Sequence, residues 1–394
     1  MRYSFFIALL LLANTGFSQT KYQKDFDELW NDINNNYAYL DEQKINWKRV
    51  KEIYEPKAGS ISTNTEFISF LESVLNELYN GHSSLNTNLA SSNRLVPSGQ
   101  DLYVEKMNGK FYITDIRNGS AAQNSGLKIG MEVTAFNKTA IDPQLKKFLP
   151  RFTDVPNTSM YQFALDMLFA GTHDTKREIS ILENGSPRSY FPDDSPAKED
   201  TSLLFAKVLN STTVYIKINN SLGNNNLVAE FDKAVDEFIH AKNIIIDLTE
   251  TPGGGNTTVA RSIMGRFISK TLPYQKHEID EKEFETKRLW IEYVVPRKKI
   301  FKGNVYVLVG HWTGSMGEGI AIGFDGMKRA TIIGTKMARL LGAIDNFRLS
   351  ETKIGYQFPT EKLYHVNGQR REDFLPGVLT KNTAETYKKA FSIK

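Results

Sequence analysis

The sequence predicts an α/β protein with more than one domain. Its 394 residues suggest two or three domains, at about 150 residues each. Over residues 203–394, short apolar runs alternate with helical patterns, an order typical of α/β folds. In such folds, functional side chains gather at the turns from strand to helix. An apolar stretch with helical spacing and a stretch of short strands precede this region.

Composition narrows the classes of function. Apolar residues make up 40% of the chain and charged residues 24%, as in soluble globular proteins. A net charge of +4 is too small and too scattered to indicate a nucleic-acid groove. The chain has no cysteine, which excludes a thiol nucleophile, disulfides and zinc–thiolate sites.

The first 18 residues predict a cleavable secretory signal. One Arg precedes the apolar run Phe5–Ala13, and the small residues Gly16 and Ser18 follow it. The run is about half the ~20 residues that a spanning helix needs, so cleavage before Gln19 is favoured over anchoring. We expect an exported protein, periplasmic or secreted, without a membrane span after signal removal.

The remaining chain divides into four predicted parts. Residues 19–95 are expected to form a helical domain, because apolar side chains recur there at helical spacing. Residues 96–190 are expected to form a domain of short strands, and the proline- and charge-rich residues 191–202 a linker. Residues 203–394 form the α/β core, in which the buried strands Ile244–Leu248 and Val305–Val309 each run into glycine-containing turns.

Ser315 lies in one of these turns, HWTGSMGEGIAIGF, at the expected start of a helix. The first amides of a helix lack intrahelical acceptors, and the helix dipole there favours negative charge. If Ser315 attacks a carbonyl, the Met316 amide is placed to stabilise the oxyanion. However, Ser315 and Glu318 also fit a capping box, which is the commoner use of this spacing.

The second turn is IIIDLTETPGGGNTT, with three consecutive glycines after a buried strand. Their amides are able to hold an anion. A P-loop is excluded by the missing Lys-Ser/Thr, and a dinucleotide site by the contiguous glycines. The amide of Gly253 or Gly254 fits a second oxyanion donor, and the alternative is a turn that needs positive φ.

A serine nucleophile needs a base with a pKa near neutrality. His82 follows a predicted helix end at Asn80-Gly81, and His311 shortly precedes Ser315. Spacing alone leaves both open. Glu372, in VNGQRREDFLPG, fits a carboxylate that orients the base, but this segment alone clearly favours a solvated loop acid.

Together, in this order, the four segments resemble the C-terminal-processing (tail-specific) and tricorn-core serine peptidase family. YNGHSSL is similar to its Asp-Gly-His-Thr segment, IIIDLTETPGGG to its Asp-Leu-Arg-x-Asn-x-Gly-Gly segment, TGSMGE to its Thr-x-Ser-x-x-Glu turn, and NGQRREDFLPGV to its closing Gly-x-x-x-Glu segment. SGLKIGMEV resembles a PDZ signature. The resemblance covers most of the chain and implies a crotonase-like β-β-α spiral core, an N-terminal helical segment and an inserted PDZ-like domain.

The family has two branches that differ in their base. Processing peptidases use a lysine 25 residues after the serine, a position held here by Leu340. The tricorn-like branch uses a histidine, the serine and a distant glutamate. The resemblance therefore implies Ser315 as nucleophile, His82 as general base and Glu372 as supporting carboxylate.

These arguments predict an exported serine peptidase that acts on peptide or protein substrates and needs no metal or other cofactor. The PDZ-like domain would bind a peptide C-terminus at the turn that contains Gly99, Asp101 and Leu102, or would serve only as a spacer that shapes the cleft. Two other functions stay open: a catalytically weak or inactive periplasmic peptide-binding module, and an esterase-type acyl hydrolase.

Overall fold

The computed structural model describes residues 19–197 and 200–394. The predicted signal, residues 1–18, lies outside the described residues, as do residues 198–199 of the predicted linker 191–202. In the described ranges, no helix combines the length and apolar character needed to cross a membrane.

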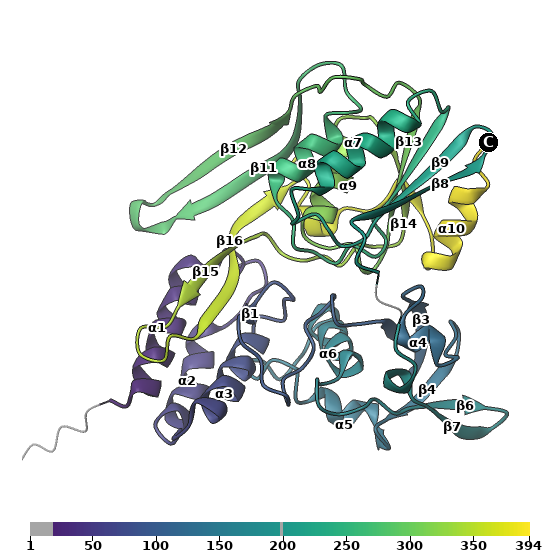
Figure 1. Ribbon diagram of the computed structural model, residues 1–394. Coiled ribbons are helices and arrows are strands. Elements are labelled where there is room, and N and C mark those ends of the chain that lie inside the picture. Colours follow the sequence, from purple (N-terminus) through teal and green to yellow (C-terminus); the bar gives the residue numbers. More distant parts are fainter. Residues whose placement is uncertain (1–18, 198–199) are drawn as a thin grey trace, which may run out of the picture.

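The first part of the described chain is mainly helical. Helices α1 (Lys21–Asn36), α2 (Trp47–Ala58) and α3 (Asn64–Asn76) pack together through buried apolar faces. Capping boxes at Thr20 and Thr63 fix where α1 and α3 begin. Strands β15 (Ala343–Arg348) and β16 (Gly355–Tyr364), from late in the chain, complete this hydrophobic core and lie beside the helices in Figure 1.

The second part contains a sheet of short strands with its own hydrophobic core. The strand order is β2-β3-β4-β6-β7, with β5 paired to β4. Helix α6 packs against β2, which is an edge strand. The elements are β2 (Leu102–Met107), β3 (Lys110–Ile116), α4 (Ala121–Asn124), β4 (Glu132–Phe136), β5 (Thr139–Ala140), α5 (Ile141–Leu145), α6 (Thr158–Ala170), β6 (Ile179–Glu183), β7 (Ser186–Tyr190) and the 3-10 helix η1 (Pro192–Asp194).

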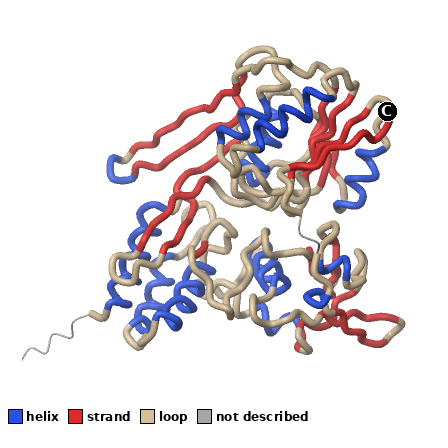
Figure 2. The backbone as a smooth tube through the Cα atoms, viewed as in Figure 1, coloured by secondary structure: helices blue, strands red, loops and turns tan. Residues whose placement is uncertain are grey.

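The third part is a six-stranded sheet in the order β17-β14-β13-β10-β9-β8, parallel except for β8. Ile244 and Ile246 face the core shared with α7, α8 and α9, whereas Ile245 faces the cluster that includes α10. Helices therefore cover both faces of the sheet, as Figure 2 shows, and the α/β prediction is confirmed. The elements are β8 (Leu204–Asn210), β9 (Thr213–Ile218), α7 (Leu227–Glu237), β10 (Asn243–Asp247), α8 (Thr257–Met264), β13 (Asn304–Val309), α9 (Met316–Gly326), β14 (Thr331–Gly334), β17 (Val378–Leu379) and α10 (Thr383–Phe391).

A further antiparallel sheet joins the helical part to the core. Its order is β1-β16-β11-β12, with β15 paired to β16. Strand β1 (Ser84–Leu85) begins two residues after His82, and β11 (Leu272–Glu281) and β12 (Thr286–Val294) form a long hairpin. The sequence patterns described above do not predict this hairpin. The sheet therefore ties the segment after His82 to the body that carries Ser315.

Candidate active site

Ser315 lies where the chain leaves β13 and enters α9. It adopts φ 51° and ψ −116°, a left-handed conformation that is strained for a residue with a side chain. Its N–H donates to Glu318 Oε2 over 2.9 Å, which is half of the predicted capping box. The hydroxyl lies toward the Glu318 amide in the capping-box arrangement, but it completes no cap hydrogen bond. Ser315 is half-buried, so its hydroxyl is held at the surface of a strained turn.

The glycine turn after β10 packs directly on the Ser315 turn. The Gly314 N–H donates to the Thr251 carbonyl over 3.0 Å. A methyl group added at Gly253 would lie 3.5 Å from Ser315 Cβ, and one at Gly255 only 2.4 Å from Met316 Cβ. A side chain at position 255 would therefore push the two turns apart.

The amides beside Ser315 differ in whether they are free. Gly253 donates its N–H to Asn220 Oδ1 over 3.2 Å. Within the described residues, the N–H groups of Gly254 and Met316 donate no hydrogen bond. Of the two glycines that the sequence suggested as oxyanion donors, Gly254 therefore has the available amide.

His82 is buried in the turn after α3, and its main-chain N–H donates to Asn80 Oδ1 over 3.0 Å. Its Nδ1 lies 2.7 Å from the Leu341 carbonyl oxygen. A carbonyl only accepts, so Nδ1 carries the proton and Nε2 is left as the basic nitrogen. Burial, and next the Arg371 cation, lower the pKa of His82 to about 4, so the ring is neutral at pH 7.

Leu340 brings the two turns to one place. A methyl group added at Gly81 would lie 2.9 Å from Leu340 Cδ2, and one added at Gly314 would lie 2.9 Å from Leu340 Cδ1. The residues immediately before His82 and Ser315 therefore approach the same leucine side chain. This leucine stands where the processing branch has its catalytic lysine.

Arg371 anchors this arrangement, although the sequence analysis did not single it out. Its buried guanidinium donates from Nη2 to the carbonyls of Leu340 and Gly342, over 2.8 and 3.0 Å. The same nitrogen lies 3.7 Å from Glu318 Oε2. Arg371 thus fixes the segment that pairs with His82 and also approaches the glutamate that holds the Ser315 amide. Nothing in NGQRREDF indicates which of its two adjacent arginines is buried.

Glu372 does not have the contact expected of it. It is buried, its Oε2 has no hydrogen-bond partner among the described residues, and burial raises its pKa. The expected support of His82 by Glu372 is therefore corrected: Nδ1 is paired with a backbone carbonyl. The physical reason is that the 3-10 helix η3 (Arg371–Asp373) directs Arg371, rather than Glu372, to the 340–342 backbone.

His311, the other candidate base, lies at the contact between the second part and the core. Its ring stacks on Tyr103 with centroids 3.8 Å apart, and its Nε2 lies 3.9 Å from Asp115 Oδ2. Asp115 also accepts from the N–H and hydroxyl of Thr383, at 3.0 and 2.8 Å. These contacts favour a docking role for His311 and leave His82 as the better base.

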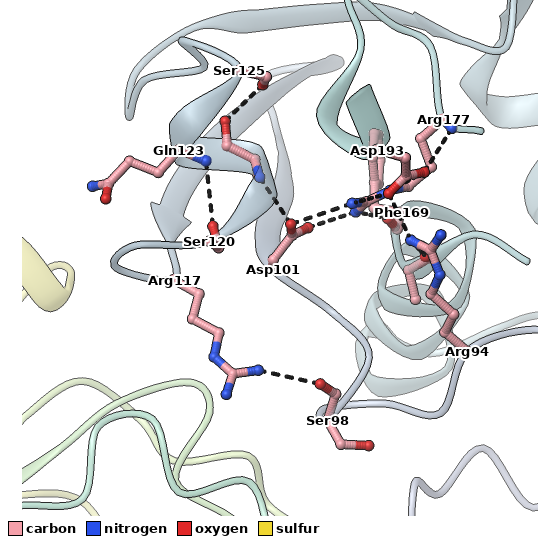
Figure 3. Close-up of polar contacts among 12 residues, drawn as sticks. Arg94, Ser98, Asp101, Arg117, Ser120, Gln123, Ser125, Phe169, Arg177 and Asp193 are labelled. Atoms are coloured by element: carbon pink, nitrogen blue, oxygen red, sulfur yellow. Dashed lines mark hydrogen bonds and ion pairs between the residues drawn. The ribbon is translucent and has the colours of Figure 1, made fainter. Parts of the chain in front are cut away.

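The turn predicted to bind a peptide C-terminus is engaged in internal contacts. Gly99 donates its N–H to the Leu95 carbonyl over 2.6 Å, and Leu102 is fully buried. The Asp101 carboxylate pairs with Arg177, with Oδ1 2.5 Å from Nη1, and accepts the Ala122 N–H over 2.9 Å. Figure 3 shows Asp101 and Asp193 on either side of Arg177. The expectation of an open carboxylate-binding turn at Gly99, Asp101 and Leu102 is therefore corrected to a structural role.

A cavity of about 660 Å³ lies between the helical part, the second part and the core, and neither Ser315 nor His82 is among the residues that line it. Gly81, Leu340 and Glu372 line it near the candidate base, and Tyr103 and Asp166 line it from the second part. Its volume suits a few residues of an extended peptide. Within the described residues, no group of three or more metal-binding side chains is present.

Comparison with known families identifies the core and the first helices separately. Residues 212–378 match the model of peptidase family S41. Residues 18–76 match the model of the tricorn protease C1 domain. No curated protein matches the chain.

Solved structures share the fold over nearly the whole chain. Mature CPAF is 14% identical with a TM-score of 0.66, covering 94% of this chain and 95% of that one. The photosystem II D1 C-terminal processing protease is 15% identical with a TM-score of 0.58, covering 92% and 93%. A putative peptidase from Parabacteroides merdae is 14% identical with a TM-score of 0.55, covering 94% and 93%. The family matches agree with the motifs that predicted them: they confirm that this chain resembles the C-terminal-processing and tricorn-core serine peptidases, and they support a serine peptidase.

Proposed function

We propose that this chain is an exported peptidase in which Ser315 is the nucleophile and His82 the general base. The observation that carries the proposal is the Ser315 turn: a strained serine at a helix start, packed on a glycine turn in which, within the described residues, the Gly254 amide donates no hydrogen bond, like that of Met316. We assign the oxyanion hole to the amides of Met316 and Gly254. Removal of one such donor typically lowers the rate by about 10²–10³.

In this mechanism, His82 Nε2 takes the hydroxyl proton as Ser315 Oγ bonds to the scissile carbonyl carbon. The carbonyl electron pair moves to oxygen, where the two amides stabilise the charge. Collapse of this intermediate breaks the C–N bond, and His82 returns the proton to the leaving amine. Water then hydrolyses the acyl-enzyme by the same route and restores Ser315.

The Leu341 carbonyl takes the role usually played by a triad carboxylate. It accepts the Nδ1–H of His82 and thereby holds the tautomer and orientation of the ring. A neutral carbonyl stabilises an imidazolium less than a carboxylate does. This agrees with the low pKa of His82 and implies a slower enzyme, because a weaker base gives a smaller driving force for proton transfer.

The finer fold is part of the same proposal. The core corresponds to a crotonase-like β-β-α spiral, supported by parallel strands that alternate with helices. The second part corresponds to a PDZ-like insert, supported by the SGLKIGMEV segment immediately before and within β4. Because Tyr103 and Asp115 dock this insert on His311 and Thr383, it serves as a spacer that shapes the substrate cleft. Export rests on the leader in residues 1–18.

A catalytically weak or inactive peptide-binding protein is the second candidate. The low pKa of His82 and the absence of a Glu372 contact favour it. Both proposals place the bound peptide in the cavity between the three parts of the molecule. They differ only in whether the bound peptide is cleaved.

Labelling with a fluorophosphonate distinguishes the two functions. We expect wild-type protein to be labelled on Ser315 and Ser315→Ala to be unlabelled with an unchanged circular dichroism spectrum. Hydrolysis of unstructured protein should be lost in the same variant. A folded wild-type protein that is not labelled would favour the binding module, and hydrolysis of short esters without any peptide cleavage would favour an esterase.

A further inference from the structure

The hairpin of β11 and β12 projects from the body of the molecule, as Figure 1 shows. A short 3-10 helix, η2 (Lys282–Phe284), lies at its tip. In the sheet order β1-β16-β11-β12, β12 pairs with β11 and with no other strand of residues 19–197 and 200–394. One side of a nine-residue strand therefore presents unpaired backbone amides and carbonyls, which are able to pair with another strand.

The two faces of β12 differ in what covers them. On one face, Trp290 stacks on His277 and Glu292 accepts a hydrogen bond from Arg261. The opposite face is uncovered and apolar. It exposes 68% of Leu289, 40% of Ile291 and 50% of Tyr293. A long, exposed, apolar edge strand of this kind marks an interaction site in a native protein.

The sequence of β12, TKRLWIEYV, is complementary to itself in antiparallel order. A twofold axis at Trp290 would place Leu289 opposite Ile291 of a second copy. It would also place Arg288 opposite Glu292, but within the chain these two already pair with Glu281 and Arg261. The apolar pair favours association, because directly opposed side chains in antiparallel strands interact. Each pair occurs twice, as an isologous interface requires.

We propose that β12 is a homodimer interface, where two copies pair edge to edge about a twofold axis at Trp290. The sheet then continues from β1-β16-β11-β12 of one copy into the same strands of the other. Because β1 begins two residues after His82, this shared sheet would connect the His82 turns of the two copies. The interface involves no residue of the proposed catalytic site.

The first test is the mass in solution, measured by light scattering after gel filtration. We expect wild-type protein to be a dimer and the double variant Leu289→Lys/Ile291→Lys to be a monomer with an unchanged circular dichroism spectrum. Val155→Lys, which changes a residue that is 82% exposed in another part of the chain, is the control and should remain a dimer. If the wild-type protein is a monomer throughout the measured concentration range, the proposal is wrong. This holds even if an added peptide is found to pair with the β12 edge.

The second test fixes the register. The chain has no cysteine, so single-cysteine variants report one contact. Opposed residues in antiparallel strands lie about 4.5–5.5 Å apart between Cα atoms, within the range for a disulfide. An equimolar mixture of Leu289→Cys and Ile291→Cys should therefore form a mixed disulfide dimer on mild oxidation. Each variant alone should cross-link much less. A wild-type dimer whose mixture does not cross-link contradicts the β12 interface.

Discussion

The turns that carry Ser315 and His82 are built in opposite ways. The Ser315 turn is local: a strand exit, a strained backbone and Glu318 three residues away hold the serine in place. The His82 turn depends on distant partners, because its ring pairs with the Leu341 carbonyl, 259 positions along the chain. The proposed nucleophile is thus positioned mainly by its own segment, whereas the proposed base is positioned by the 340–342 segment and by Arg371, which anchors that segment.

Burial disfavours the charged form of one side chain in each turn, His82 and Glu318. It lowers the pKa of His82 to about 4 and raises the pKa of Glu318 to about 7, so both side chains are shifted toward their neutral forms. The Arg371 cation lowers both pKa values. One buried residue therefore links the electrostatics of the two turns.

Among the changes that separate the two turns, replacement of His82 should have the largest effect on activity. In His82→Ala, we expect kcat/KM to fall by about 10²–10⁴, the usual contribution of a positioned general base. The Ser315 turn should persist because it does not depend on His82. The control is His311→Gln, which removes the stacking on Tyr103 but not the base. Equal losses in the two variants would contradict the assignment of His82.

Replacement of Arg371, which anchors the 340–342 segment, should have the next largest effect on activity. Arg371→Met removes two hydrogen bonds to the 340–342 backbone, so His82 loses a fixed partner. We expect kcat to fall by roughly 10–100-fold, since misplacement of a catalytic group by about 1 Å has an effect of that size. The free energy of unfolding should fall by about 2 kcal/mol or more, because two buried carbonyls are left unsatisfied.

Arg370→Met is the matched control for the anchor. Arg370 is the adjacent residue, and its side chain is 45% exposed where it pairs with Asp373. We expect stability and kcat to stay close to the wild-type values. Urea unfolding and steady-state kinetics on both variants provide the measurement. If Arg370→Met loses as much activity as Arg371→Met, the loop as a whole, rather than its buried guanidinium, supports the base.

The sequence predicted the local turn better than the distant one. The strand, glycine turn and serine of β13 and α9 follow from periodicity and helix-start rules, and the structure contains each of them. Leu341 and Arg371 carry no such signal. A backbone carbonyl has no sequence identity, and only the tertiary fold decides which of two adjacent arginines turns inward. The same limit applies to Asp101, whose partner Arg177 lies 76 positions away.

The pH dependence of the enzyme sharpens the same comparison. The acid limb of kcat/KM reports the pKa of the free base, so it should lie near pH 4 rather than near 6.5. Activity at pH 5.5 should therefore remain close to that at pH 7. In Arg371→Met the limb should move to higher pH, because the cation that lowers the His82 pKa is gone. A wild-type limb near 6.5 would show that the ring is solvated during turnover.

The low pKa of His82 should also make the stability of the protein depend on pH. The unfolded chain binds a proton at His82 below about pH 6.5, whereas the native ring binds it only near pH 4. His82 therefore makes the protein less stable as the pH falls through this range. His82→Gln should reduce that acid destabilisation, as measured by urea unfolding at pH 4.5 and 7. If the free energy of unfolding differs between pH 4.5 and pH 7 as much in His82→Gln as in the wild type, groups other than His82 cause the acid destabilisation.

Glu372→Gln should have the smallest effect. Where a carboxylate orients the catalytic histidine, its amide replacement lowers kcat by about 10⁴. Here the Leu341 carbonyl orients His82, and Glu372 Oε2 has no partner. We therefore expect kcat to fall by less than about tenfold, and stability to stay equal or rise, since a buried carboxylate is replaced by a neutral group. A loss near 10⁴ would mean that Glu372 replaces Leu341 at His82 once substrate is bound, and the distant turn would then resemble the triads of the tricorn-like branch.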